Sequence, residues 1–175
     1  DIGSSTGGFT DCALQNGAKF VYALDVGTNQ LVWKLRNDER VKVMEQTNFR
    51  HSVKEDFDVY EIDIASIDVS FISLSLILPN LSEIIKDGGE VCVLVKPQFE
   101  AERNEINKGI VDSLNVHKRV INEVIEKAKI NQLFLENLTV SPIRGTKGNI
   151  EYLAKFSNKN NFSSTEEIVN RLFNN

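Results

Sequence analysis

The sequence predicts an α/β fold with a mostly parallel, doubly wound sheet and an antiparallel last strand. Short apolar runs typical of buried strands alternate with segments of helical periodicity along most of its 175 residues. Near the C-terminus, two strand-like segments have only the basic, glycine-rich loop "RGTKG" between them, so the last strand should run back along its neighbour. The sequence contains neither an internal repeat nor a linker, which predicts one domain over residues 1–175.

The expected elements alternate in chain order, and glycine and proline mark several of their ends. Gly17 and Gly88 should end the first and third helices, Pro79 should break or bend the third helix, and Pro97 should end the most strand-like segment. Helices are predicted at residues 9–18, 29–38, 73–88 and 116–131, and a capping pattern predicts another at 163–175. Strands are predicted at residues 19–27, 41–49, 58–68, 89–100, 133–143 and 149–157.

Composition argues against several classes of protein. A net charge of −5 at pH 7 does not suit a chain that binds nucleic acid through its bulk charge, although a local basic patch remains compatible with it. The most apolar stretch, "VSFISLSLILPNL", is shorter than the roughly 20 residues that span a bilayer. Cys12 and Cys92 form no disulfide framework or metal site and are expected in the core. We therefore expect a cytoplasmic protein without a metal and without a membrane partner.

A glycine-rich turn opens the sequence as Asp1-x-Gly3-x-x-x-Gly7-Gly8-Phe9. Glycines after a strand let the backbone approach a ligand, and the following helix offers free N–H groups. The spacing does not fit the G-x-G-x-x-G pattern of dinucleotide sites, which disfavours a nicotinamide-dependent dehydrogenase. The acid would repel a pyrophosphate but suits a zwitterionic amino acid with a sulfonium centre. S-adenosylmethionine is therefore the expected cofactor, and a purely structural turn is the alternative.

The residues around this turn add two expectations. Asp25 ends the next strand in "YALDVG", where its carboxylate can accept hydrogen bonds from ribose hydroxyls. A glycine turn of this kind normally follows a buried strand. We therefore expect the first strand of the sheet just before Asp1, and the chain to be a fragment of a longer protein.

Three charged residues are expected at one edge of the sheet. Asp68 follows a buried strand, Lys96 ends the most strand-like segment, and Glu151 begins the last strand. Ligands of a doubly wound sheet lie at the carboxyl ends of its parallel strands, and an antiparallel last strand begins at that edge. The three side chains should therefore converge beside the cofactor. The alternative is three separate surface roles: a helix cap, an extended lysine and an exposed glutamate.

Several stretches resemble one known family. In consistent order from Asp1 to about Phe156, they are "DIGSSTGGFTDCAL", "ALDVG", "TNFR", "DVSFISL", "LVKPQFE" and "GNIEYL". They resemble the TlyA (hemolysin A) family of FtsJ-like, S-adenosylmethionine-dependent 2′-O-ribose methyltransferases that act on ribosomal RNA. The resemblance implies a Rossmann-like class I methyltransferase fold. It also implies a Lys-Asp-Lys-Glu catalytic tetrad whose last three members match Asp68, Lys96 and Glu151.

The resemblance places the first lysine of that tetrad, and a small S4-type RNA-binding domain, ahead of the glycine turn. It implies a cofactor site made by Asp1, Gly3, Ser5, Gly7, Gly8, Phe9, Asp25, Val26, Asn48 and Asp68. Basic residues in loops that should border the site are the expected RNA contacts: Arg50, Lys108, Arg144 and Lys147. The loop "AERNEIN" is less basic than the family pattern.

The expected reaction is methyl transfer to a ribose 2′-hydroxyl of ribosomal RNA, with cytidine as the nucleotide that the family implies. Lys96 either removes the hydroxyl proton or stabilises the developing alkoxide, and the sequence leaves both roles open. The expected partner is ribosomal RNA or a ribosomal subunit, with the oligomeric state undetermined. One rival is a non-catalytic RNA-binding or ribosome-assembly module. Another is a membrane-active haemolysin, for which the sequence offers no basic amphipathic helix.

Overall fold

A mixed sheet forms the centre of the structure, a computed structural model that describes residues 1–159 and 164–173. Its strands are β1 (Val21–Leu24), β2 (Val41–Met44), β3 (Ile62–Ile67), β4 (Ile85–Val95), β5 (Phe134–Val140) and β6 (Tyr152–Ser157). β1 pairs with β2, and the other strands follow in the order β3-β4-β6-β5. Ile2 joins the two parts because it forms parallel bridges to Leu24 of β1 and Ile67 of β3.

Strand direction agrees with the predicted fold class. β1 and β2 are parallel, as are β3 and β4, whereas β6 is antiparallel to both β4 and β5. Among the strands described, β6 alone therefore runs against the others. The carboxyl ends of β1, β3 and β4 meet the start of β6 at one edge of the sheet. The α/β fold with an antiparallel last strand is confirmed.

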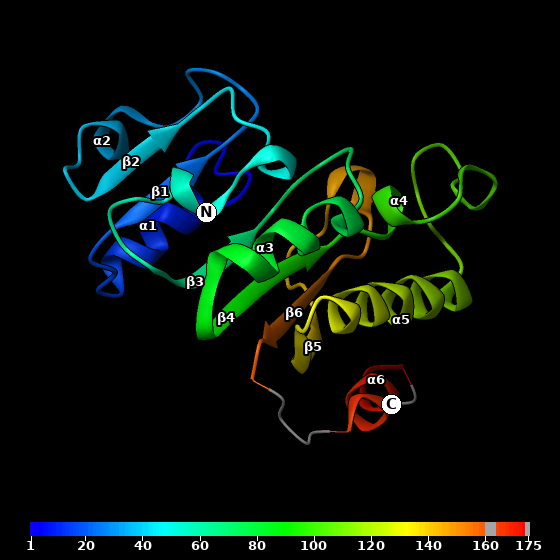
Figure 1. Ribbon diagram of the computed structural model, residues 1–175. Coiled ribbons are helices and arrows are strands. Elements are labelled where there is room, and N and C mark those ends of the chain that lie inside the picture. The colour runs from blue at the N-terminus through cyan, green and yellow to red at the C-terminus, as the bar shows by residue number, and fades with distance from the viewer. Residues whose placement is uncertain (160–163, 174–175) are drawn as a thin grey trace.

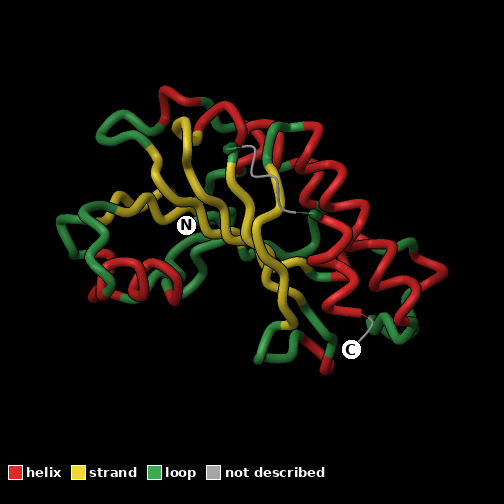
Figure 2. The backbone as a smooth tube through the Cα atoms, turned by 90° about the horizontal axis from the view of Figure 1, so that it is seen from below, coloured by secondary structure: helices red, strands yellow, loops and turns green. Residues whose placement is uncertain are grey.

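The helices are α1 (Gly8–Gln15), α2 (Trp33–Arg36), α3 (Leu78–Ile84), α4 (Pro97–Glu100), α5 (Leu114–Ile130) and α6 (Thr165–Phe173). Short 3-10 turns are η1 (Phe49–His51), η2 (Lys54–Asp56), η3 (Leu74–Leu76), η4 (Arg103–Glu105) and η5 (Thr146–Gly148). α3 and α5 lie together on one side of the sheet, with α6 beyond α5 (Figures 1 and 2). α1 contacts β1 at the other end of the molecule.

Two hydrophobic clusters explain this arrangement. Val91, Val93 and Val95 alternate along β4 and belong to the main core, together with Leu78 of α3 and Ile121 of α5. A smaller cluster lies where α1 and α2 meet β1. Burial of these apolar side chains drives the packing of helices on the sheet. This packing fixes the positions of the strand ends, which carry the polar residues.

Some element boundaries differ from the sequence prediction. The third helix was expected to run to Gly88, but α3 ends at Ile84 and Ile85 begins β4, where it pairs with Ile62 of β3. Pairing with β3 therefore outweighs helical continuation. Pro79 lies in the first turn of α3, where proline fits, and the predicted helix is broken just ahead of it, between η3 and α3.

The predicted helix at 29–38 is a single turn, α2. The backbone N–H groups of Asn29, Gln30 and Leu31 donate to the carboxylate of Glu45, which holds that stretch as a loop. Pro97, expected to end a strand, begins α4. The predicted C-terminal helix is found as α6 with Ser164 Oγ accepting from Glu167 N, while positions 163 and 174–175 lie outside the described residues.

The expectation that both cysteines lie in the core is wrong. Cys12 and Cys92 are free and exposed. Cys92 alternates with buried Val91 and Val93 along β4, so its side chain projects from the opposite face of the strand. None of the helices described is long and apolar enough to cross a membrane.

Candidate active site

The glycine turn that opens the chain has a left-handed backbone at several positions. Gly3 and Gly7 have φ values of 82° and 103°, and Ser5 has a φ of 48°. A Cβ atom on Gly3 would lie 2.1 Å from the carbonyl oxygen of Asp68, and one on Gly7 would lie 2.3 Å from a methyl group of Leu35. Both glycines are therefore required for close packing as well as for conformation.

Asp1 organises this turn through its side chain. One carboxylate oxygen accepts hydrogen bonds from the backbone N–H and the hydroxyl of Thr10, at 3.0 and 2.7 Å. The other accepts from the hydroxyl of Ser66 on β3 at 3.1 Å. The carboxylate thus ties the turn to α1 and to the sheet, which makes it a support of the turn.

Asp25 faces the same turn from the end of β1. Its two carboxylate oxygens accept from the backbone N–H groups of Ser5, at 2.8 Å, and Gly27, at 2.7 Å. The side chain is largely buried, whereas the neighbouring Val26 is 71% exposed. Each oxygen of Asp25 keeps a second lone pair, so the carboxylate can still accept hydrogen bonds from the hydroxyl groups of a ligand.

Asn48 lies close to Asp25 at this edge. Thr47 N donates to the carbonyl oxygen of Asp25 at 3.0 Å, and the side chain of Asn48 caps η1 by accepting from Arg50 N at 3.1 Å. On the other side of the turn, Phe9 is partly exposed on α1. A side chain at Gly8 would meet no atom within 4 Å. The predicted cofactor residues therefore surround one open strand edge.

Asp68 and Lys96 form an ion pair beside the turn. Lys96 Nζ lies 2.6 Å from Asp68 Oδ1 and donates to Ser70 Oγ at 3.2 Å. Asp68 N donates to the carbonyl oxygen of Ile2, so this pair directly adjoins the start of the glycine turn. Only 13% of the Lys96 side chain is exposed. The structure thus brings the two predicted catalytic residues into contact.

Glu151 lies next to this pair but contacts a different side chain. β4 and β6 pair as far as Val95 and Tyr152, and continuing that register by one residue puts Glu151 opposite Lys96. Opposite residues of an antiparallel pair share a face. The carboxylate of Glu151 is 5% exposed and accepts from Gln98 Nε2 at 2.8 Å. Asp68 and Lys96 are thus in contact, whereas the contact found for the Glu151 carboxylate is with Gln98.

An aromatic pair borders the lysine. The rings of Phe71 and Phe99 are 4.9 Å apart, and Lys96 Nζ lies 6.0 Å from the centre of the Phe99 ring. Phe71 is 90% exposed and has a φ of 62°. An exposed phenylalanine held in a left-handed backbone is rare, and such strain concentrates at functional sites.

Two of the predicted RNA-binding residues meet on paired loops. Lys147 Nζ donates to the carbonyl oxygen of Lys108 at 2.7 Å. The buried side chain of Asn149 joins the same loops, because it accepts from Val111 N and donates to the carbonyl oxygen of Gly109. The loops 107–111 and 144–149 therefore form one basic surface next to the start of β6.

The other two predicted RNA contacts, Arg144 and Arg50, do not lie on the same element. Arg144 precedes Gly145 on the same loop as Lys147 and is exposed. Arg50 lies on η1, whose backbone carbonyls bind Asn80 of α3, so it is separate from the paired loops.

Within the described residues, no group of three or more histidine, cysteine, aspartate or glutamate side chains could hold a metal ion.

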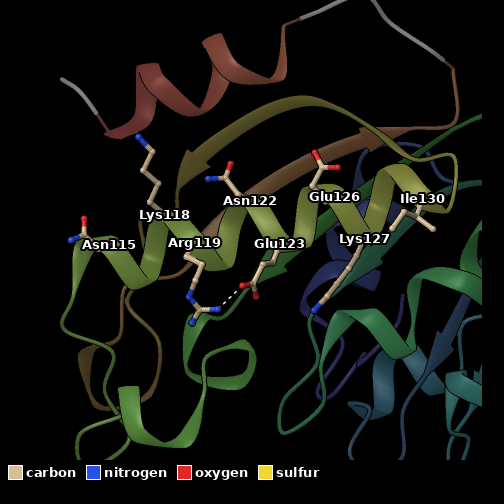
Figure 3. Close-up of a pocket in the computed structure, with 8 residues that line it drawn as sticks. All are labelled: Asn115, Lys118, Arg119, Asn122, Glu123, Glu126, Lys127 and Ile130. Carbon is tan, nitrogen blue, oxygen red and sulfur yellow. Dashed lines mark hydrogen bonds and ion pairs between the residues drawn. The ribbon is translucent and has the colours of Figure 1, made fainter.

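A hollow along α5 contains none of these residues. Figure 3 shows that its lining side chains all come from α5, and that Arg119 pairs with Glu123 across one turn of the helix. Lysine, arginine and glutamate alternate along it. The arrangement is that of a solvated helix face.

Comparison with known proteins agrees with this geometry. Residues 1–157 match the family of FtsJ-like methyltransferases. The chain belongs to this family. Both the resemblance inferred from the motifs and the methyltransferase fold are confirmed.

Individual relatives are considerably longer than this chain. It is 56% identical over 154 residues to YqxC of Bacillus subtilis, named as a candidate rRNA methyltransferase, covering 87% of this chain and 55% of that protein. It is 39% identical over 153 residues to the 16S/23S rRNA (cytidine-2′-O)-methyltransferase TlyA of Mycobacterium tuberculosis, covering 87% of this chain and 57% of that protein. The chain thus spans little more than half the length of these two curated relatives.

A solved structure of similar sequence also matches. A candidate hemolysin from Lactococcus lactis has a TM-score of 0.91 and 51% identity, covering 98% of this chain and 85% of that one.

The sequence alone did not single out Ser70, Gln98 or the aromatic pair of Phe71 and Phe99. All four residues lie inside the motifs "DVSFISL" and "LVKPQFE" beside Asp68 and Lys96, which was the available signal.

Proposed function

We propose that the whole protein transfers a methyl group from S-adenosylmethionine to the 2′-hydroxyl of a cytidine in ribosomal RNA. The observation that carries this proposal is the Lys96–Asp68 ion pair beside the glycine turn, with Glu151 and Lys96 each one residue beyond the last β4–β6 pair, Val95 and Tyr152. Membership of the FtsJ-like methyltransferase family and the names of the rRNA-modifying relatives support it. A ribosomal substrate would place the protein in the cytoplasm.

The residues around the turn fit the cofactor. S-adenosylmethionine supplies, when bound, a methyl group activated by a sulfonium sulfur. Gly3 and Gly7 shape the turn by packing against Asp68 and Leu35, and Gly8 leaves open space beside the backbone. The carboxylate of Asp25 can accept hydrogen bonds from ribose hydroxyls. Val26 and Asn48 flank Asp25, while Phe9, Gly8 and Ser5 line the other side. Asp1 keeps the turn in place through Thr10 and Ser66.

Lys96 is best suited to act on the ribose hydroxyl. A 2′-hydroxyl is a poor nucleophile until its proton leaves or the charge on its oxygen is stabilised. With Asp68 at 2.6 Å, the lysine is fixed in direction and can orient the hydroxyl and stabilise the developing negative charge. Asp68 and Ser70 hold Lys96 in position. This geometry favours charge stabilisation over removal of the proton by the lysine.

RNA would meet two features of this edge. Lys108, Arg144 and Lys147 provide positive charge for phosphates, and Phe71 with Phe99 offers a surface on which an unpaired base can stack. Arg50 would contact a more distant part of the RNA. The partner in this proposal is ribosomal RNA or a ribosomal subunit.

We also propose that residues 1–175 are the methyltransferase part of a longer protein. Within the described residues, β1 and β3 do not pair with each other, and Ile2 forms a single parallel bridge to each of them. A strand in line with Ile2 would complete the sheet there. The first lysine of the tetrad and an S4-type RNA-binding domain would come from the same additional part.

The test is methyl transfer by the whole encoded protein. Purified ribosomal subunits and S-adenosylmethionine carrying a labelled methyl group should give label on a ribose 2′-oxygen, and nucleotide mapping identifies the base. The Lys96→Ala variant should lose about 100-fold or more in rate while cofactor affinity changes less than about threefold, because Lys96 lies outside the glycine turn. Label on a base, or a variant that is as active as the wild type, would contradict the proposal. Vesicle leakage by pure protein would instead support a membrane-active haemolysin.

A further inference from the structure

We propose that Gln98 is a positioning residue that holds the carboxylate of Glu151 away from the Lys96–Asp68 ion pair. This inference rests on the proposed function, because it concerns the same site. Neither the family resemblance nor the charge pattern of the sequence assigns a role to Gln98. The contacts of the Gln98 side chain indicate this role.

The orientation of the Gln98 amide follows from its neighbour. An ionised carboxylate only accepts hydrogen bonds, so the NH₂ group of Gln98 must face Glu151, to which it donates at 2.8 Å. The carbonyl oxygen Oε1 then points the other way, where it is buried and has no hydrogen-bond partner among the described residues. An unsatisfied buried oxygen is unfavourable, so packing alone would favour an apolar side chain. The amide therefore has a role beyond packing.

The surrounding backbone fixes both partners of this contact. Pro97 begins α4, and Glu100 at its other end accepts from Leu74 N and Ser73 Oγ at 2.7 Å each. These bonds attach α4 to η3 and leave Gln98 little freedom. On the side of Glu151, a Cβ atom at Gly145 would lie 2.0 Å from Oε1 of the glutamate. The absence of a side chain at Gly145 makes room for the carboxylate.

The consequence concerns the competition between two carboxylates for one ammonium group. Lys96 Nζ contacts Asp68 and Ser70, and Glu151 lies opposite Lys96 in the strand register. A buried carboxylate without a neutral donor would draw Lys96 toward itself or take up a proton. By donating an N–H, Gln98 satisfies Glu151 and leaves Lys96 with Asp68. The ammonium group then stays on the side of the glycine turn.

The experiment compares variants of the whole encoded protein in the methyl-transfer assay. Gln98→Leu should lower kcat about tenfold, while KM for S-adenosylmethionine and for RNA changes less than twofold. The acid limb of the kcat profile should move to higher pH, because Glu151 loses its donor and ionises less readily. Charged residues on the elements that adjoin Glu151 are Lys96 and Asp68 at the strand ends, and Arg144 and Lys147 on the loop of Gly145. They are unchanged in the variant.

Two further variants make the result specific. Gln98→Glu has the same shape but places a second acid beside Glu151, so its kcat should fall further and recover partly at lower pH. Gln15→Leu is the matched control, because Gln15 also donates to a carboxylate, that of Asp11, on the exposed side of α1. It should leave kcat and the pH profile unchanged. If Gln98→Leu fails to fold, as thermal unfolding would show, Gln98→Glu alone decides the question.

A direct titration separates this inference from the proposed function. The carboxyl carbon of Glu151, followed by NMR with isotope-labelled glutamate, should titrate at a higher pH in Gln98→Leu than in the wild type. A wild type that transfers no methyl group would refute the proposed function, while the titration would still report on Gln98. Equal titration midpoints, or an unchanged kcat and pH profile in both Gln98 variants, would overturn the inference.

Discussion

At the scale of single residues, two glycines of the same turn have different surroundings. Gly3 has a φ of 82°, and a Cβ there would meet the carbonyl oxygen of Asp68 at 2.1 Å, whereas Gly8 is the first residue of α1 with nothing within 4 Å. Gly3→Ala should therefore lower the free energy of unfolding by more than about 1 kcal/mol. Gly8→Ala should change it by less than about 0.5 kcal/mol.

Urea denaturation measures both changes, and calorimetry adds the cofactor. If Gly8 lines the cofactor site, Gly8→Ala should weaken S-adenosylmethionine binding without a loss of stability. A Gly8→Ala variant with wild-type affinity would remove Gly8 from the site. Equal stability of the two variants would contradict the packing described for Gly3.

Replacing Phe71 tests whether the rings of Phe71 and Phe99 form a surface on which an RNA base stacks. Its ring is 90% exposed, so Phe71→Ala should leave thermal unfolding nearly unchanged. Stacking on a base contributes about 1–3 kcal/mol, so KM for RNA should rise roughly tenfold. Trp33→Ala is the control, because Trp33 is also highly exposed, at 76%, but lies on α2. A KM that is unchanged in Phe71→Ala, or raised equally in Trp33→Ala, would speak against the stacking surface.

The burial of Tyr152 should make the free energy of unfolding depend on pH in the alkaline range. Burial raises the pKa of Tyr152 from 10.0 to about 12, and its hydroxyl lies 2.9 Å from His117 Nδ1. Between these two values the unfolded chain has lost the phenolic proton and the folded chain still holds it. Stability should therefore be complete below pH 10 and fall by up to about 2–3 kcal/mol toward pH 12.

The measurement is the difference in unfolding free energy between pH 9 and pH 11.5. Tyr152→Phe should show a smaller alkaline loss than the wild type, although its stability at pH 9 is lower because the bond to His117 is gone. Tyr60→Phe is the comparison for a tyrosine that is 55% exposed, and its alkaline loss should equal that of the wild type. Equal losses in all three proteins would contradict the burial of Tyr152.

At the scale of elements, strand–helix alternation was predictable because buried strands and amphipathic helices have different periods. The ends of α2 and α3 were not, because tertiary contacts decide them. Asn29 has a left-handed φ of 55°, and the carboxylate of Glu45 accepts from the N–H groups at 29–31 in that loop conformation, while Ile85 pairs with β3. Neither partner is adjacent in sequence.

The paired basic loops are a second element whose assembly the sequence did not reveal. Lys108 and Lys147 were predicted separately as RNA contacts, but the hydrogen bonds of Asn149 bring their loops together. Arg144→Ala and Lys147→Ala should each reduce the dependence of RNA affinity on salt by about one phosphate contact. Binding measured over a range of salt concentrations gives that slope.

Lys19→Ala is the matched control for the loop variants. Lys19 is exposed and precedes β1, at the end of the strand away from the site, so its removal should leave the salt slope unchanged. If all three variants change the slope equally, general charge rather than the paired loops binds the RNA. An unchanged slope in the loop variants would exclude them from the interface.

At the scale of the whole molecule, the meeting of Asp68 and Lys96 was predictable because the carboxyl ends of parallel strands meet at one edge. Asp68 and Lys96 are in contact there, and Glu151 lies opposite Lys96. The supporting contacts were not predictable, because Gln98–Glu151 and Glu100–Leu74 depend on how α4 packs. The charge pattern of the sequence located the charged residues at this edge, and the packing of short turns decides which side chains they contact.

The central claim is that the glycine turn, Asp25 and the strand edge form an S-adenosylmethionine site. Calorimetric titration of S-adenosylmethionine into the whole encoded protein, with NAD as the control ligand, tests it most directly. The account predicts saturable binding of S-adenosylmethionine, weakened about tenfold or more in Asp25→Ala because a hydrogen-bonded charged group is lost, and no binding of NAD. Binding of NAD, or no binding of S-adenosylmethionine to the folded protein, would contradict it.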